Sequence, residues 1–252
     1  MFHSQIDRNT LVSTPSPAPV VPAERRGKFG QLLEIAGVPA GQILGKFRAC
    51  LPGSWIVSVG NSGYTALNSD LYGYCPVEAV AVVQLREILR QKAGYYPAIL
   101  KSYVLVGKGE ITGEPFCHGV SAQAVHAAIR KHAGKPDCAQ QVVHAAQRWI
   151  FQLTEKQHAA SVRQGDVIMF PVPKPKQTVG LVSGPVLIGG SHQLRSPEVI
   201  QITKGEDYLA RDPALWHTKA QHDPTYAPRD GWYRVRQARR EATYEFAPQY
   251  GD

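Results

Sequence analysis

The sequence predicts an α+β fold in two parts, a mixed N-terminal domain with a helix-turn-helix pair and a small β-rich C-terminal domain. Helical periodicity is clearest between residues 121 and 153. After Lys156 the chain becomes rich in Gly, Pro and β-branched residues and loses that period. With 252 residues, 43% of them hydrophobic, the chain is long enough to bury the core of one large or two modest domains.

The change in composition along the chain divides it into three segments. Residues 1–27 are expected to form an extended tail, because prolines alternate with small residues over positions 14–19. Residues 28–158 are expected to form the mixed domain, and residues 159–252 the β-rich domain. The Pro-rich tail is a candidate arm for contact with a protein partner.

The elements of the mixed domain follow from apolar spacing. Short helices are predicted at residues 29–36 and 39–49, and strands at residues 54–59 and 99–106. Pro76 suits a first helical turn, where its missing N–H costs nothing. A helix is therefore predicted over residues 75–89, with Cys75 at its N-terminus.

Two further helices are predicted at residues 121–132 and 137–153, each beginning at a suitable N-cap residue. They share a short sequence pattern that puts His126 and His144 at matching positions. Beyond them, runs of β-branched residues predict strands in the β-rich domain at residues 167–172, 179–188, 199–203 and 232–237.

Charge and hydropathy limit the partners. The formal net charge is +8 at pH 7, which favours nucleic acid or another polyanion as a partner. The candidate contacts are basic side chains near aromatic ones: Arg130, Lys131, Arg148, Arg234, Arg236, Arg239 and Arg240. No apolar run approaches the roughly 18 residues that cross a bilayer, and no signal-peptide pattern is present. We therefore expect no membrane association, a cytoplasmic location and four reduced cysteines.

Cys75 is the best candidate for a catalytic thiol. The N-terminus of a helix stabilises a thiolate, and papain-like enzymes place their cysteine at a similar helix start. His118 and His192 are candidate bases, and Cys117 precedes His118 at the start of another expected helix. Because neither base is paired with Cys75 by spacing, we predict that Cys75 is a structural rather than a catalytic residue.

His192, His217 and His222 form a candidate metal site in the β-rich domain. Three imidazoles could ligate zinc or another transition metal. His192 follows an expected strand end, and loops leaving neighbouring strand ends gather at one edge of a sheet. We expect the three side chains to lie on one side of the domain, and ordinary hydrogen-bonding histidines are the alternative.

The C-terminal part also carries a series of spaced motif residues. They are Gln164-Gly165-Asp166-Val167, Gly190-Ser191-His192, His217, His222, Pro228, Gly231, Tyr233, Val235, Gln237, Arg240 and Glu241. In this pattern residues 164–241 resemble a small, uncharacterised bacterial β-domain family. The chain departs from it by replacing the first of two paired histidines and by lengthening the spacing between His217 and His222. The resemblance implies an architecture and a candidate surface, and no reaction.

Three functional hypotheses remain open. The leading one is a non-enzymatic binding protein associated with nucleic acid or with an assembly, whose binding would be strongly salt-dependent and weakly sequence-specific. The second is a hydrolase that depends on Cys75 or on a metal held by His192, His217 and His222. The third is a structural component of a larger assembly. No Walker A loop, zinc-finger spacing or RNP signature is present.

Overall fold

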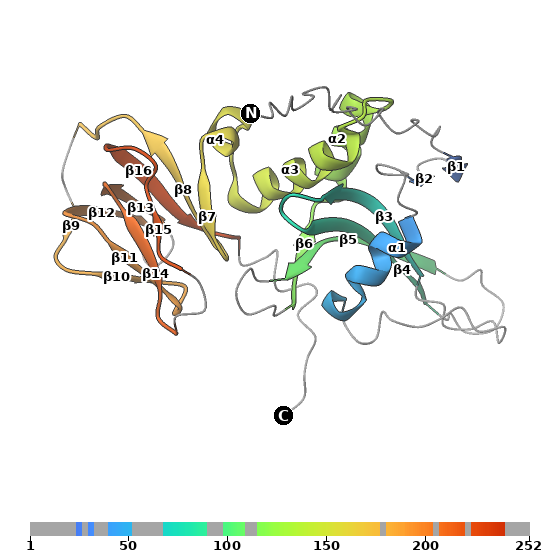
Figure 1. The fold of residues 1–252 in the computed structure, drawn as a ribbon, viewed down its shortest axis with the longest axis horizontal. Coiled ribbons are helices and arrows are strands. Elements are labelled where there is room, and N and C mark those ends of the chain that lie inside the picture. The colour runs from blue at the N-terminus through green and yellow to red at the C-terminus, as the bar shows by residue number, and fades with distance from the viewer. Residues whose placement is uncertain are drawn as a thin grey trace, which may run out of the picture.

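The structure, a computed structural model, describes residues 24–26, 30–32, 40–51, 68–89, 98–108, 115–176, 180–203, 207–219 and 223–239. Sixteen strands and four α-helices occur within these ranges, and every strand pair is antiparallel (Figure 1). The predicted fold class is therefore wrong. The described chain is β-rich and contains no N-terminal domain built around a helix-turn-helix pair.

The N-terminal part is a four-stranded sheet covered on both faces. Its strands, in spatial order, are β3 (Asn68–Cys75), β4 (Val80–Leu89), β5 (Ala98–Lys108) and β6 (Pro115–Val120). Helices α2 (Ala122–His132) and α3 (Cys138–Phe151) cover one face, and α1 (Ala40–Lys46) with a 3-10 turn (Arg48–Cys50) covers the other (Figure 1). A small pair of strands, β1 (Glu24–Arg26) and β2 (Gly30–Leu32), precedes them.

Double coverage explains why the helix predicted over residues 75–89 is wrong. Val80 and Val82 face the core under α3, whereas Ala81 and Val83 face the core under α1. A strand buried on both faces shows a continuous apolar run instead of alternation, and such a run cannot be distinguished from a buried helix by periodicity. The helix predicted near residues 29–36 is also wrong where the structure describes it, because residues 30–32 are strand β2.

Helices α2 and α3 lie where the sequence predicts helices, but they do not form an independent helix-turn-helix unit. Their apolar faces are buried against the sheet. The contact between α3 and β3 depends on Gly73, where an added Cβ would lie 2.9 Å from the Ala139 carbonyl oxygen and 2.9 Å from Val142 Cγ1. Because both helices cover a sheet, they complete its core instead of presenting a free recognition helix.

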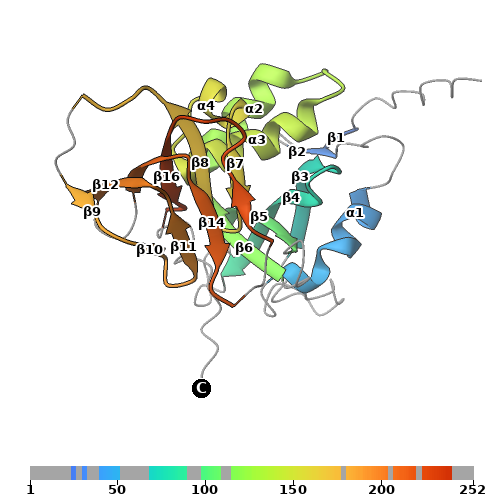
Figure 2. The same cartoon turned by 60° about the vertical axis from the view of Figure 1, so that its left-hand side comes forward.

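The C-terminal part consists of two antiparallel sheets. The six-stranded sheet has the order β7 (Val162–Gln164), β8 (Val167–Val172), β16 (Trp232–Gln237), β13 (Asp207–Arg211), β12 (Glu198–Thr203) and β9 (Leu181–Val182). The four-stranded sheet has the order β10 (Val186–Ile188), β11 (His192–Arg195), β14 (Ala214–His217) and β15 (Thr225–Tyr226). The two sheets enclose a core that includes Met169, Leu194 and Tyr208 (Figure 2).

The two parts share one of the three hydrophobic clusters found among the described residues. Ile168 and Phe170 of β8 point away from the C-terminal core and join the cluster formed by α3 and the N-terminal sheet. The short helix α4 (Glu155–Ala159) links α3 to β7. Arg236 of β16 also donates from Nη1 to the carbonyl oxygens of Phe151 and Gln152, at 3.1 Å each, at the end of α3.

Most of the remaining expectations hold. The helix near residues 39–49 and the strands at 99–106, 167–172, 199–203 and 232–237 are confirmed. The single strand predicted over 179–188 is instead two strands, β9 and β10, separated by a bend at Gly184 with a φ of 84°. The strand predicted at residues 54–59 and the tail up to residue 23 lie outside the described residues.

Candidate metal centre

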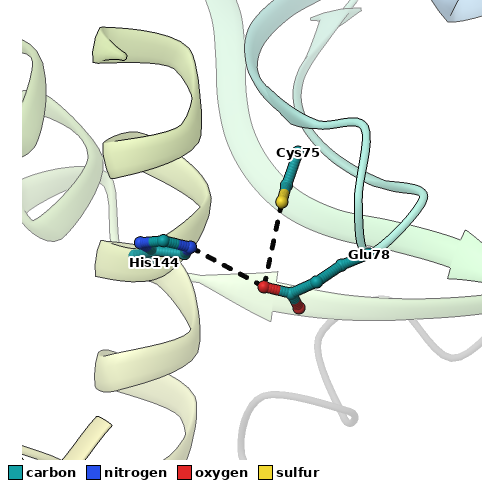
Figure 3. Close-up of side chains that lie close together, drawn as sticks. All are labelled: Cys75, Glu78 and His144. Atoms are coloured by element: carbon teal, nitrogen blue, oxygen red, sulfur yellow. Dashed lines mark hydrogen bonds and ion pairs between the residues drawn. The ribbon is translucent and has the colours of Figure 1, made fainter. Parts of the chain in front are cut away.

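Three side chains with metal-binding atoms meet where the β3–β4 turn touches α3. Cys75 is the last residue of β3, Glu78 lies in the turn, and His144 lies in the middle of α3 (Figure 3). The turn reverses the chain sharply, with Ala79 at a φ of 50°. The close packing of α3 on Gly73 places His144 beside this turn. Cys75 is therefore at a strand end, and not at the helix start that the sequence predicts.

The distances within this group suit a metal ion. Glu78 Oε1 lies 3.9 Å from Cys75 Sγ and 3.7 Å from His144 Nε2, and all three donor atoms are within 4.8 Å of one another. A tetrahedral zinc ion with bonds of about 2.0–2.3 Å holds its ligand atoms roughly 3.3–3.7 Å apart. Both distances from Glu78 Oε1, to Cys75 Sγ and to His144 Nε2, are thus within a few tenths of an ångström of that spacing. Among the described residues, this is the one group of three such donors.

The second carboxylate oxygen of Glu78 is held by a different set of residues. Glu78 Oε2 accepts a short hydrogen bond from Gln147 Nε2 and lies 3.7 Å from an Nη2 atom of Arg163. Gln147 is itself fixed, because its Oε1 is 2.8 Å from His158 Nε2. Outer partners of this kind orient the residues that bind a metal. They leave Oε1 facing Cys75 and His144.

The protonation states fit a site that receives a cation. Burial raises the pKa of the Cys75 thiol, and the negative charge of Glu78 raises it further. Burial lowers the pKa of His144. Burial and the neighbouring His144 lower the pKa of His158 to about 4, so both imidazoles are neutral at neutral pH. A neutral imidazole is the form that binds a metal, and a bound metal would deprotonate the thiol.

The same electrostatics disfavour Cys75 as a free nucleophile. A thiol that is buried beside a carboxylate stays protonated, whereas a nucleophile must be a thiolate. None of the contacts found among the described residues joins Cys75 to His118. Cys117 and His118 lie in strand β6 and do not open a helix, so that expectation is wrong. Burial raises the pKa of Cys117 to about 12 and lowers that of His118.

The structure brings together two of the three C-terminal histidines. His192 and His217 are directly opposite in the β11–β14 pair, with ring centroids 5.0 Å apart. His192 is buried, and its Nδ1 lies 3.3 Å from Asp166 Oδ1 and 3.0 Å from Ser191 Oγ. His222 lies outside the described residues. Of the two, His192 contacts Asp166, the aspartate of the Gln-Gly-Asp-Val motif, whereas His217 Nδ1 accepts a hydrogen bond from the Lys219 backbone N–H at 3.2 Å.

The seven basic residues expected to form one nucleic-acid surface do not share one surface, and those that the structure describes make different contacts. Arg234 and Arg236 both pair with Asp207, and the hydrogen bonds that Arg234 donates to that carboxylate raise the pKa of Arg234. Lys131 pairs with Glu155 on the surface, with Nζ 3.1 Å from Oε2. Arg148 and Arg239 meet Lys131 in a groove described below. Arg130 is exposed on α2, and Arg240 lies outside the described residues.

Sequence reasoning missed Glu78 and His144 as partners of Cys75. Glu78 was assigned to the first turn of the expected helix, and His144 was compared with His126. In the structure His126 Nε2 contacts the Tyr103 hydroxyl at 2.6 Å and takes no part in the metal-type group. The one available signal was the Cys-Pro-x-Glu spacing of residues 75–78, which places a thiol and a carboxylate at the two ends of a tight turn.

Comparison with protein-family models, curated proteins and solved structures finds no significant match to this chain. The resemblance of residues 164–241 to a bacterial β-domain family therefore stays a prediction. In the part of the chain that the structure covers, no helix has the length and hydrophobicity needed to cross a membrane.

Proposed function

We propose that the protein is a zinc-dependent hydrolase whose ion is bound by Cys75, Glu78 and His144. The observation that carries the proposal is the divided environment of the Glu78 carboxylate. One oxygen faces a thiol and an imidazole at ligand spacing, and the other is anchored by Gln147 and Arg163. A carboxylate held only for a surface ion pair would not need this arrangement.

The donor set favours a hydrolytic over a structural role for the ion. Structural zinc sites use four Cys or His ligands, whereas catalytic sites use three protein ligands and keep the fourth position for water. Here three protein donors of mixed type are present, and the side chains of Glu78 and His144 are 30% and 22% exposed, so solvent can reach them. A zinc ion in such a site lowers the pKa of its bound water and supplies a hydroxide nucleophile.

Residues of this chain would assist that chemistry. Arg163, at 3.7 Å from Glu78, places a guanidinium at the edge of the site, where it can pair with a negatively charged part of a substrate. Gln147 and His158 keep the carboxylate in one orientation. The Cys75 group is preferred as the metal site to the predicted set of His192, His217 and His222, because the structure describes all three of its donors and does not describe His222.

Metal binding is tested first by substitution with cobalt(II), whose bond to a thiolate gives intense near-ultraviolet absorption. The wild-type protein, with reduced thiols, is expected to show this band and to bind one zinc ion by elemental analysis. Cys75→Ser should abolish the band, and His144→Ala should weaken zinc binding by about tenfold or more. Cys117→Ser is the matched control, because Cys117 packs on the opposite face of the sheet. Wild-type protein without a metal-dependent band would refute the site.

Hydrolysis is tested separately with the zinc-loaded protein and a panel of chromogenic esters and phosphate esters. Turnover should disappear on chelation and return with zinc, and it should be lost in Cys75→Ser and retained in Cys117→Ser. Metal binding without turnover of any substrate would reduce the site to a structural centre.

A second candidate function is binding of a polyanion, the leading expectation from the sequence. One observation favours it, the cationic groove between α2 and α3 described in the next subsection. Contact with an assembly through the Pro-rich tail and a cytoplasmic location stay predictions.

A further inference from the structure

A groove between α2 and the C-terminal half of α3 gathers positive charge from three separate segments. It has a volume of about 410 Å³, and its lining includes Lys131 of α2, Arg148 of α3 and Arg239, which follows β16. None of its lining residues in the described part of the chain is acidic. Cavities of several hundred cubic ångströms are typical of small-molecule sites.

The groove has an apolar floor and one fixed wall. Alanines of both helices, among them Ala128 and Ala145, form the floor. Arg239 stacks on the ring of Trp149, with the guanidinium carbon 4.9 Å from the ring centroid. Its backbone N–H also donates to the Ile150 carbonyl oxygen at 3.1 Å. Arg239 is therefore held in position at the groove, and is not a freely mobile surface side chain.

Two side chains that line the groove each carry a buried nitrogen with no hydrogen-bond partner among the described residues. His132 is only 7% exposed, and its Nδ1 makes no hydrogen bond there. The Nε of Arg239 is likewise buried and without a hydrogen-bond partner. Buried polar groups in folded proteins are normally paired. Both side chains line the groove, so a rotation of either side chain would bring its unpaired nitrogen to a ligand bound there.

Cations near the ends of α2 and α3 also stabilise the helix dipoles, and this accounts for part of the charge. It does not account for Arg239, which lies outside both helices, or for the buried nitrogen of His132. Glu155 lies 3.1 Å from Lys131 Nζ and offsets part of the positive charge, since Lys131 and Arg148 both lower the pKa of its carboxyl. The pair is exposed on both sides, at 61% and 64%, and such pairs contribute little to stability, so an anionic ligand can displace Glu155 from Lys131.

We propose that this groove binds the phosphate group of a nucleotide, either free or within a single strand. Two guanidinium groups and an ammonium group match an oxyanion that has several acceptor oxygens. The alanine floor can take the apolar surface of the attached sugar or base. Lys131, Arg148 and Arg239 are thus the anion-binding residues of the groove. Arg234 and Arg236 are no longer candidates for nucleic-acid contact, because their guanidinium groups pair with Asp207.

The test uses the full-length protein with three probes: inorganic phosphate, adenosine monophosphate and a labelled single-stranded oligonucleotide of about 12 nucleotides. Calorimetry measures the first two probes and fluorescence anisotropy the third, all at low salt. Arg148→Gln and Arg239→Gln are each expected to weaken binding about tenfold. His132→Leu should weaken binding about fivefold, because leucine is similar in size to histidine but lacks the hydrogen-bonding nitrogens.

The matched control is Lys174→Gln with Lys176→Gln, which removes two positive charges from the loop after β8. When both proteins are compared at about 0.15 M salt, where the Debye length is about 8 Å, its affinity should stay within about twofold of the wild type, because charges farther than that from the ligand are largely screened. Thermal midpoints by circular dichroism show that each variant is folded. Tighter binding of the oligonucleotide than of the monophosphate, with a steep salt dependence, identifies a strand as the source. The reverse order identifies a free nucleotide.

Two outcomes would overturn the proposal. One is the absence of binding for all three probes at low salt. The other is an equal loss of affinity in the groove variants and in the Lys174/Lys176 control. Neither result affects the cobalt experiment at Cys75, so the two proposals fail independently.

Discussion

At the residue scale, Glu78 is the side chain on which the candidate centre depends. Its two oxygens have different partners, Cys75 and His144 on one side and Gln147 and Arg163 on the other. A carboxylate fixed from behind loses little rotational freedom on binding a metal, because its orientation is already set. The chemistry of the site therefore depends on one side chain in a four-residue turn.

The first prediction concerns that carboxylate. Glu78→Gln keeps its shape and removes its charge, so zinc affinity should fall about tenfold or more in a calorimetric titration. Glu155→Gln is the control, because it removes an exposed carboxylate at the start of α4 and should leave the zinc affinity unchanged. An equal affinity of Glu78→Gln and wild type would show that the carboxylate is not a ligand.

The second prediction concerns the pH dependence of stability in the metal-free protein. Burial and the neighbouring His144 lower the pKa of His158 from 6.5 to about 4. The folded state thus binds fewer protons than the unfolded state between these values. The contribution of neutral His158 to the free energy of unfolding is fully present above about pH 6.5 and is lost as the pH falls toward 4.

Urea unfolding at pH 7 and pH 4.5, with a chelator present, measures the effect. His158→Asn should lose less stability than the wild type over this interval. The expected difference is about 1 kcal/mol, since the partly exposed ring is partly screened by solvent. An equal loss of unfolding free energy between pH 7 and pH 4.5 in the two proteins would contradict the lowered pKa of His158.

At the scale of elements, the centre depends on how closely α3 approaches β3. His144 and Gln147 come from α3, whereas Cys75 and Glu78 come from the end of β3 and the turn after it. Gly73 permits the contact because it has no Cβ. The helix α4 adds His158, and it is held at its start by a capping box between Thr154 and Gln157.

The third prediction follows from this packing. Gly73→Ala places a methyl group against the Ala139 carbonyl and Val142, so α3 must move away from the sheet. The free energy of unfolding should fall by about 1–3 kcal/mol, and zinc affinity should fall with it. Gly45→Ala is the matched control, because Gly45 is in helix α1 with no atom within 4 Å of the added Cβ.

Gly45→Ala should be neutral or should raise stability by up to about 1 kcal/mol, as expected for alanine in a helix. Chemical unfolding and zinc titration of both variants measure the two effects. A stable Gly73→Ala protein with unchanged zinc affinity would mean that the close approach of α3 is not needed.

At the scale of the whole molecule, the two parts meet in a shared hydrophobic cluster. Phe170 of β8 packs in the same cluster as Tyr72 of the N-terminal sheet and Val142 of α3. Arg236 binds the end of α3, and Arg163 of β7 reaches Glu78 in the N-terminal turn. The candidate centre therefore lies where the two parts join, with residues from both contributing to it.

The fourth prediction is that the described parts unfold together. Far-ultraviolet circular dichroism and tryptophan fluorescence should give one coincident transition in urea, because a shared core couples the two sides. Phe170→Ala should lower the free energy of unfolding by about 3–5 kcal/mol while the transition stays single. Two separate transitions in the wild-type protein would show that the core does not couple them.

How much the sequence could predict differs between the two parts. Strands 199–203 and 232–237 were predictable, because turn residues flank short runs that contain β-branched and aromatic residues there. Strand β4 was not, since burial on both faces removes the alternation that marks a strand. The error carried over to Cys75 and Glu78, which were placed at a helix start when they belong to a strand end and a turn.

The sequence by itself determined the secondary-structure elements with clear periodicity, the positive charge and the chemical types available for a site. Only the tertiary structure decided which of those side chains meet. His144 is far from Cys75 along the chain, and nothing in its local pattern distinguishes it from His126. Their different roles arise because α3 packs on β3 at Gly73, whereas His126 contacts Tyr103. Such contacts depend on the packing of distant segments, which local spacing does not encode.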